Sequence, residues 1–113
     1  MTALAPLWFT DQKDPTDVDD WILDFSGALA APGALSSSAT YDTITGTPTV
    51  TAIPSDMSVS DIQLATGAGG SDTAVGFWLS GGTSGGTYQI SVTVKTTGGR
   101  TFERSAWLNV ATL

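Results

Sequence analysis

YQISVTVKTTGGRTFERSAWLNV, residues 88–110, carries the clearest alternation of apolar and polar residues in the chain. From Tyr88 to Val94 every second residue is apolar and the residues between are polar, which is typical of a strand with one buried face. Gly98-Gly99 predicts a two-residue hairpin turn, because glycine tolerates positive φ at both positions. The return strand is expected to point one set of side chains into the core: Phe102, Ala106, Leu108 and Val110.

Two residues of the return strand depart from the pattern of apolar residues on the core side and polar residues on the outer side. Arg104 falls in the core-facing phase and Trp107 in the outer phase. An Arg near a strand end can lay its methylene stem on apolar surface and keep its charge in water, so no buried charge is predicted. An outward Trp107 is not required for folding and is a candidate interface residue.

The same alternation extends upstream. Residues 73–79 predict a strand with Thr73, Val75, Phe77 and Leu79 on its buried face, and residues 59–66 predict another. Residues 41–53 are rich in Thr, Ile and Val but are interrupted by glycine and proline, so they predict two short strands or one strand with a bulge.

The segment around Trp21 has two interpretations. Trp21, Leu23 and Phe25 alternate on one face of a strand, whereas residues 18–29 also fit the 3.6-residue period of a helix. The aromatic side chains and the Ser-Gly that follows favour the strand.

About seven short strands at this spacing predict an all-β, immunoglobulin-like β-sandwich. Tyr88, at the start of the penultimate strand, is placed where a tyrosine corner would hold its phenol. Residues 1–18 contain two prolines and are expected to form an extended N-terminal arm, leaving residues 19–113 as the sandwich domain. The glycine-rich run SGGTSGG precedes a strand and lacks the Lys-Ser/Thr of a phosphate loop, so it is a strand connection.

Composition excludes several functions. The 113-residue chain fits one domain and contains no Cys and no His, which removes the usual ligands of zinc and haem and the histidine of catalytic triads. No carboxylate pair of the glycosidase kind stands out, because Glu103 is the only Glu. We therefore expect no enzymatic activity and no cofactor or metal. The chain also lacks an export signal or a membrane-length apolar run, so a soluble protein is expected.

The formal net charge is −7, with only four basic residues. Nucleic acid and anionic membranes are disfavoured as partners, because both require clustered Lys and Arg. The acids are concentrated early: six of the ten Asp lie between Asp11 and Asp24, whereas residues 95–113 are weakly basic. Three interpretations of the acidic stretch are open: a bound cation, a solvated loop with Asp as turn former, or a docking surface for a basic partner. The EF-hand pattern does not fit, because Ile22 stands where glycine is needed.

The four tryptophans are expected to divide into two groups. Trp21 and Trp78 are interpreted as core or intersheet aromatics. Trp8, in the arm, and Trp107 are interpreted as interface residues or as packing between the arm and the sheet. Exposed tryptophans beside polar side chains would also suit a carbohydrate site.

Three segments together resemble a family of small tailed-bacteriophage structural proteins, the fiber–tail adaptors. They are KDPTDVDDWILDFSGAL (13–29), YDTI (41–44) and FWLSGGTSGGTYQISVTVKTTGGRTFERSAWLNV (77–110). One departure is that Asp20-Trp21-Ile22-Leu23-Asp24-Phe25 carries its aromatics in exchanged positions. The resemblance implies an immunoglobulin-like virion component without enzymatic activity.

The leading hypothesis is a virion part, present in several copies, that joins tail or neck to fibers by protein–protein contacts. The alternatives are a capsid decoration protein and a carbohydrate-binding attachment module. One contact predicted from charge alone is the acidic segment of one copy against the Arg100 and Arg104 hairpin of the next. The interface candidates are Trp8, Asp14, Asp17, Asp20, Asp24, Arg100, Arg104 and Trp107.

Overall fold

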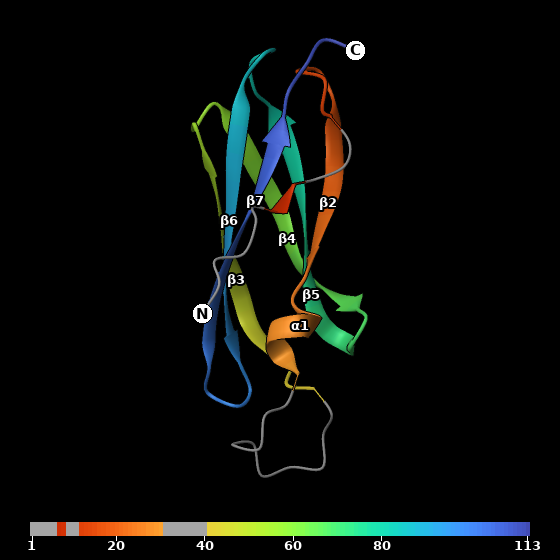
Figure 1. Ribbon diagram of the computed structural model, residues 1–113, viewed down its shortest axis with the longest axis vertical. Helices are drawn as coiled ribbons and strands as arrows, with labels where there is room; N and C mark the ends of the chain where they lie inside the picture. The colour runs from red at the N-terminus through yellow and green to blue at the C-terminus, as the bar shows by residue number, and fades with distance from the viewer. Residues whose placement is uncertain (1–6, 9–11, 31–40) are drawn as a thin grey trace.

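The computed structural model describes residues 7–8, 12–30 and 41–113, which form a two-layer β-sandwich (Figure 1). The elements in chain order are β1 (Leu7–Trp8), β2 (Val18–Asp24), α1 (Ser26–Leu29), β3 (Ile44–Ile53), β4 (Met57–Gly67), β5 (Gly70–Gly81), β6 (Thr87–Thr96) and β7 (Thr101–Asn109).

One sheet has four strands in the order β1-β7-β6-β3, and the other has three in the order β2-β5-β4. Strand β1 pairs parallel with β7, and the other pairings are antiparallel. If β2 to β7 are matched to strands B to G, the sheets are B-E-D and G-F-C, the order of an immunoglobulin sandwich. The predicted all-β sandwich is confirmed, and the strand order is compatible with its immunoglobulin-like form.

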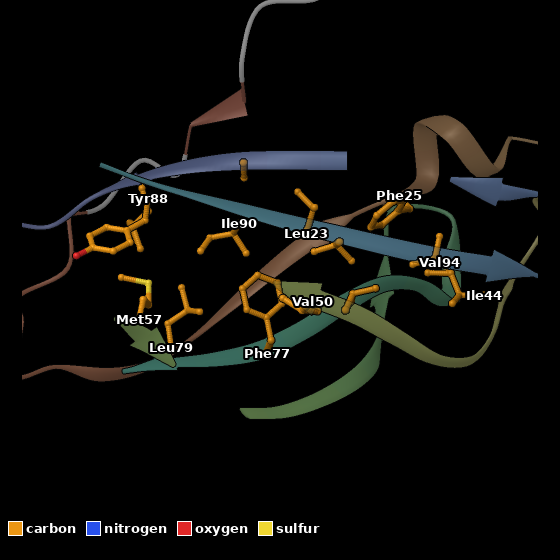
Figure 2. Packing of buried hydrophobic residues seen from close by; sticks show 14 of the residues in the cluster. Leu23, Phe25, Ile44, Val50, Met57, Phe77, Leu79, Tyr88, Ile90 and Val94 are labelled. Atoms are coloured by element: carbon orange, nitrogen blue, oxygen red, sulfur yellow. The ribbon is translucent and has the colours of Figure 1, made fainter. Parts of the chain in front are cut away.

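The core lies between the two sheets (Figure 2). Tyr88, Ile90, Val92 and Val94 of β6 are all buried, as the alternation predicted, and so is the facing row of β5. In Figure 2, Phe77 and Leu79 of β5 point toward the side chains of β6. Each fully buried side chain of this size stabilises the fold by about 1.5–3 kcal/mol relative to an exposed one.

Residues 18–24 form strand β2, so the strand interpretation of the Trp21 segment is confirmed. The helical interpretation of residues 18–29 is wrong except for the single turn α1 at their end, which the sequence did not predict as a separate element. Strand β3 is one strand whose register shifts between Thr45 and Thr49, in agreement with the bulge alternative. In β4 a similar shift accompanies Asp61, which has a φ of 49°.

The predicted two-residue turn at Gly98-Gly99 is wrong. Residues 97–100 separate β6 from β7, and of the two glycines only Gly99 has a positive φ, 86°. Thr96 closes this longer loop, since its N–H donates to the carbonyl of Arg100 at 2.9 Å and its Oγ1 accepts from the N–H of Arg100 at 2.9 Å.

Strand β7 follows the predicted phase. Ala106, Leu108 and Val110 are buried, Arg104 is exposed, and Trp107 lies on the outer face, partly exposed. Across the described residues no helix has the length and apolar character needed to cross a membrane.

Candidate interaction surfaces

The outer face of the β2-β5-β4 sheet carries exposed apolar side chains. Asp20, Trp78 and Ser60 are cross-strand partners in one row, and Ile22, Gly76 and Gln63 are partners in the next row. Trp78 is 38% exposed and Ile22 is 53% exposed. The prediction that Trp78 belongs to the core is therefore wrong: its neighbours Phe77 and Leu79 face the core, so the pleat turns Trp78 outward.

A shallow hollow of about 200 Å³ lies on this face. Gly76, in the central strand β5, contributes no side chain to it, while Trp78, Ile22 and Gln63 are among the residues that surround it. Asp20 and Asp61 also line the hollow. Apolar and acidic groups therefore meet at one place on the sheet.

The two sheets differ in charge. Strands β2, β4 and β5 contain five Asp (Asp19, Asp20, Asp24, Asp61 and Asp72) and no Lys or Arg. The strands of the other sheet contain Lys95, Glu103 and Arg104. The three-stranded sheet is thus wholly acidic, and the four-stranded sheet is close to neutral.

The outer face of the four-stranded sheet is rich in hydroxyl groups. Ser91 and Ser105 are hydrogen-bonded across β6 and β7 at 2.9 Å, and Thr93 Oγ1 donates to Glu103 Oε2 at 3.2 Å. Trp107 lies on this face in register with Trp8 of β1. The structure therefore brings together, at the level of the backbone, the two tryptophans that were selected as interface candidates.

The predicted basic hairpin is partly engaged within the chain. Arg100 Nε is 3.3 Å from Asp42 Oδ2, and a terminal guanidinium nitrogen donates to the carbonyl of Leu29 at 3.4 Å. The guanidinium carbons of Arg100 and Arg104 lie 5.2 and 5.5 Å from the centroid of the Phe102 ring, within cation–π range. Arg100 as an interface residue remains a prediction, although its side chain has a structural partner.

Asp42 is a buried acceptor that organises this end of the sandwich. Its Oδ1 accepts from the N–H groups of Thr43 at 2.9 Å and Gly98 at 3.0 Å. Burial alone raises the pKa of Asp42, but the hydrogen bonds from Thr96, Thr43, Gly98 and Arg100 outweigh it and hold the pKa below its ordinary value.

Asp24 joins the end of β2 to the β4–β5 hairpin. Its carboxylate accepts from the N–H and Oγ of Ser26, at 2.9 and 2.5 Å, and from the N–H of Ala68 at 2.9 Å. Burial raises the pKa of Asp24, but the hydrogen bonds from Ser26 and Ala68 prevail and lower it. This carboxylate is satisfied by the fold itself.

Asp14 and Asp17 precede β2, whereas Asp24 is its last residue. Figure 1 shows that the first end of β2 lies near the C-terminus. Asp14 accepts from the N–H and Oγ1 of Thr16 and, at 2.8 Å, from the N–H of Leu113. The hydrogen bond from the Thr16 backbone, followed by that from Leu113, lowers the pKa of Asp14. Asp17 accepts from the N–H of Asp14 at 3.2 Å. The acidic candidates are therefore spread along β2 and the segment before it, and Asp20 is the one that lines the hollow.

Lys13 is buried, which the sequence did not indicate. Its Nζ donates to the carbonyls of Gly81 at 2.7 Å and Asp14 at 3.0 Å, and its backbone pairs with Asn109 and Ala111. Desolvation lowers the pKa of Lys13, and the nearby carboxylates of Asp17 and Asp14 partly offset that effect.

Tyr88 has the geometry expected of a tyrosine corner. Its hydroxyl accepts from the backbone N–H of Thr83, five residues upstream, at 2.7 Å and donates to Asp56 Oδ2 at 2.8 Å. Thr83 Oγ1 also donates to Asp56, and the hydrogen bonds from Thr83 and then Tyr88 lower the pKa of this carboxyl group.

In the parts of the chain that the structure describes, no three acidic side chains gather in a way that would hold a metal ion. Sequence reasoning did not select Ile22, Asp61, Gln63 and Gly76 as interface candidates. Ile22 and Gly76 had a usable signal, because each lies out of phase with the apolar residues on either side of it in a predicted strand. That these residues lie together depends on cross-strand register, which the sequence does not state.

The fold defines a small β-sandwich domain with two chemically different outer faces, and its buried polar groups mostly hold loops together. A comparison with protein families matches residues 13–109 to the family described as Podophage GP4 fiber-tail adaptor protein gp77. The match covers most of the chain, so the protein belongs to this family and is a virion component, as its sequence resemblance implied. A search for curated relatives found no match.

Proposed function

We propose that this protein is a non-enzymatic adaptor that joins the phage tail or neck to the fibers through protein–protein contacts. Family membership supports a structural adaptor role. The observation that carries the joining role is the difference between the two outer faces, one acidic with an exposed Trp78 and one hydroxyl-rich with Trp107.

Two unlike faces suit an adaptor for a physical reason. A subunit that connects two different partners needs two surfaces that do not attract the same partner. A difference in charge between the two surfaces lets each one favour its own partner. The two sheets pack against each other (Figure 1), so their outer faces point in opposite directions and both can be occupied at once.

The test uses particles assembled without this protein, to which the purified chain is added. We expect the chain to bind and to restore fiber attachment, with cryo-EM density between tail and fiber. Density on the capsid lattice would instead identify a decoration protein. Particles that neither bind the chain nor need it for fiber attachment would contradict the adaptor role.

A further inference from the structure

The geometry points to the hollow beside Trp78 as the place where the adaptor receives a basic side chain of a neighbouring virion protein. This inference rests on the proposed adaptor function and deepens it by naming one of the two docking faces and the chemistry of its occupant. Three independent features of the β2-β5-β4 sheet carry it.

The first feature is the exposure of large apolar groups on one sheet face. Trp78 and Ile22 come from adjacent strands β5 and β2, in neighbouring rows of the sheet, and both are exposed, as is Val18 at the start of β2. Burial of such groups against a partner is favourable, and Trp is strongly enriched among the residues that dominate binding energy.

The second feature is Gly76, which the fold itself does not require. Its φ is not in the positive region, and a Cβ added there would meet only the carbonyl oxygens of Trp21 and Gln63, at 3.9 and 4.0 Å. A glycine inside a central strand weakens the strand and often marks a place where another chain or ligand approaches closely. The lack of a side chain at Gly76 leaves the floor of the hollow open.

The third feature is charge. Asp20 and Asp61 line the hollow, and the whole three-stranded sheet lacks a basic residue. A Lys or Arg from a partner would find two carboxylates and the ring of Trp78, which attracts a cation through its π face. At about 200 Å³ the hollow is below the roughly 300–1,000 Å³ of small-molecule pockets, so it suits a protruding side chain.

The decisive variant is Gly76→Val, which fills the hollow with a residue that strands favour. The thermal midpoint of Gly76→Val should equal or exceed that of the wild-type chain. One of two steps should fall at least tenfold: the binding of the chain to particles assembled without it, or the attachment of fibers to those particles. Trp78→Ala should weaken the same one of these two steps. Asp20→Asn should weaken it severalfold, and the loss should shrink as salt is added.

Asp72→Asn is the matched control, because it removes the same charge from the same sheet outside the hollow, and Asn tolerates the φ of 59° found there. Normal binding and fiber attachment by Gly76→Val would overturn the docking face while leaving the adaptor role intact. Equal effects of Asp20→Asn and Asp72→Asn would overturn the basic occupant. A wild-type dimer that Gly76→Val dissociates would show that the occupant is a second copy, which also overturns it. Failure of the wild-type chain itself to bind would instead count against the adaptor function.

Discussion

At the scale of single residues, Asp42 is the buried acid among the residues that the structure describes. It is buried, accepts two backbone N–H groups and pairs with Arg100. Its pKa in the folded protein lies below the ordinary 3.8. Ionised Asp42 therefore contributes stability at all pH values above about 3.8, and that contribution is lost as the pH falls through the folded-state pKa.

Asp42→Asn should lower the free energy of unfolding by about 1.5–3 kcal/mol at neutral pH, because a charged acceptor is replaced by a neutral one. The difference from wild type should narrow as the pH falls below 3.8. Urea denaturation at pH 7 and pH 3 measures both values, with the exposed Asp20→Asn as control. A difference that stays constant with pH would show that charge is not the cause.

The hydroxyl of Tyr88 is the second residue whose effect can be isolated. Tyr88→Phe keeps the buried ring but removes the acceptor for Thr83 and the donor to Asp56. We expect destabilisation of about 1–2 kcal/mol. A double-mutant cycle with Asp56→Ala should be non-additive, because the two groups share one hydrogen bond, and strict additivity would contradict the contact.

At the scale of elements, the β4–β5 hairpin is held by close packing as well as by hydrogen bonds. A Cβ on Gly69 would come within 2.6 Å of the Tyr41 ring, and the N–H of Gly69 donates to Ser26 Oγ at 2.8 Å. Gly69→Ala should therefore destabilise the protein by about 1–3 kcal/mol through overpacking.

The matched control is Gly27→Ala in α1, where an added Cβ meets nothing within 4 Å. It should be neutral or stabilise by up to about 1 kcal/mol, because Ala is the better helix former. Thermal melts compare the midpoints of Gly69→Ala and Gly27→Ala, and equal midpoints would contradict the close packing of the Tyr41 ring against Gly69.

The loop between β6 and β7 shows why turns are harder to predict than strands. Gly98-Gly99 indicated a two-residue turn from local conformational preference. In the fold, Asp42 accepts the N–H of Gly98, and Thr96 hydrogen-bonds to Arg100, which stabilise a longer loop. Asp42 and Gly98 are 56 residues apart, so no local pattern could have indicated this contact.

At the scale of the whole molecule, the arm and the body can be separated experimentally. A chain lacking residues 1–11 loses β1 but keeps Lys13, so its thermal midpoint should change by less than about 5 °C. A chain lacking residues 1–18 also loses the Lys13 hydrogen bonds to Gly81, Asn109 and Ala111, and its midpoint should fall by more than about 10 °C. Equal midpoints would support a body that begins at residue 19.

The shorter truncation should also have a second effect. Removal of β1 leaves the edge of β7 unpaired at Ala106 and Trp107, and an unpaired edge promotes strand pairing between molecules. We expect concentration-dependent self-association of the chain lacking residues 1–11, measured by sedimentation velocity, and a strictly monomeric variant would contradict it.

The residue pattern predicted most of the strands, and for β2, β5, β6 and β7 it also predicted the side that faces the core. Composition excluded Cys and His chemistry. These follow from the period-two alternation and from composition, which are local properties. The pairing of Asp42 with Arg100, the burial of Lys13 and the meeting of Ile22, Gly76 and Trp78 on one face are properties of the folded chain that no local pattern indicates. They depend on strand register and sheet order, because these bring together residues that are far apart in the chain.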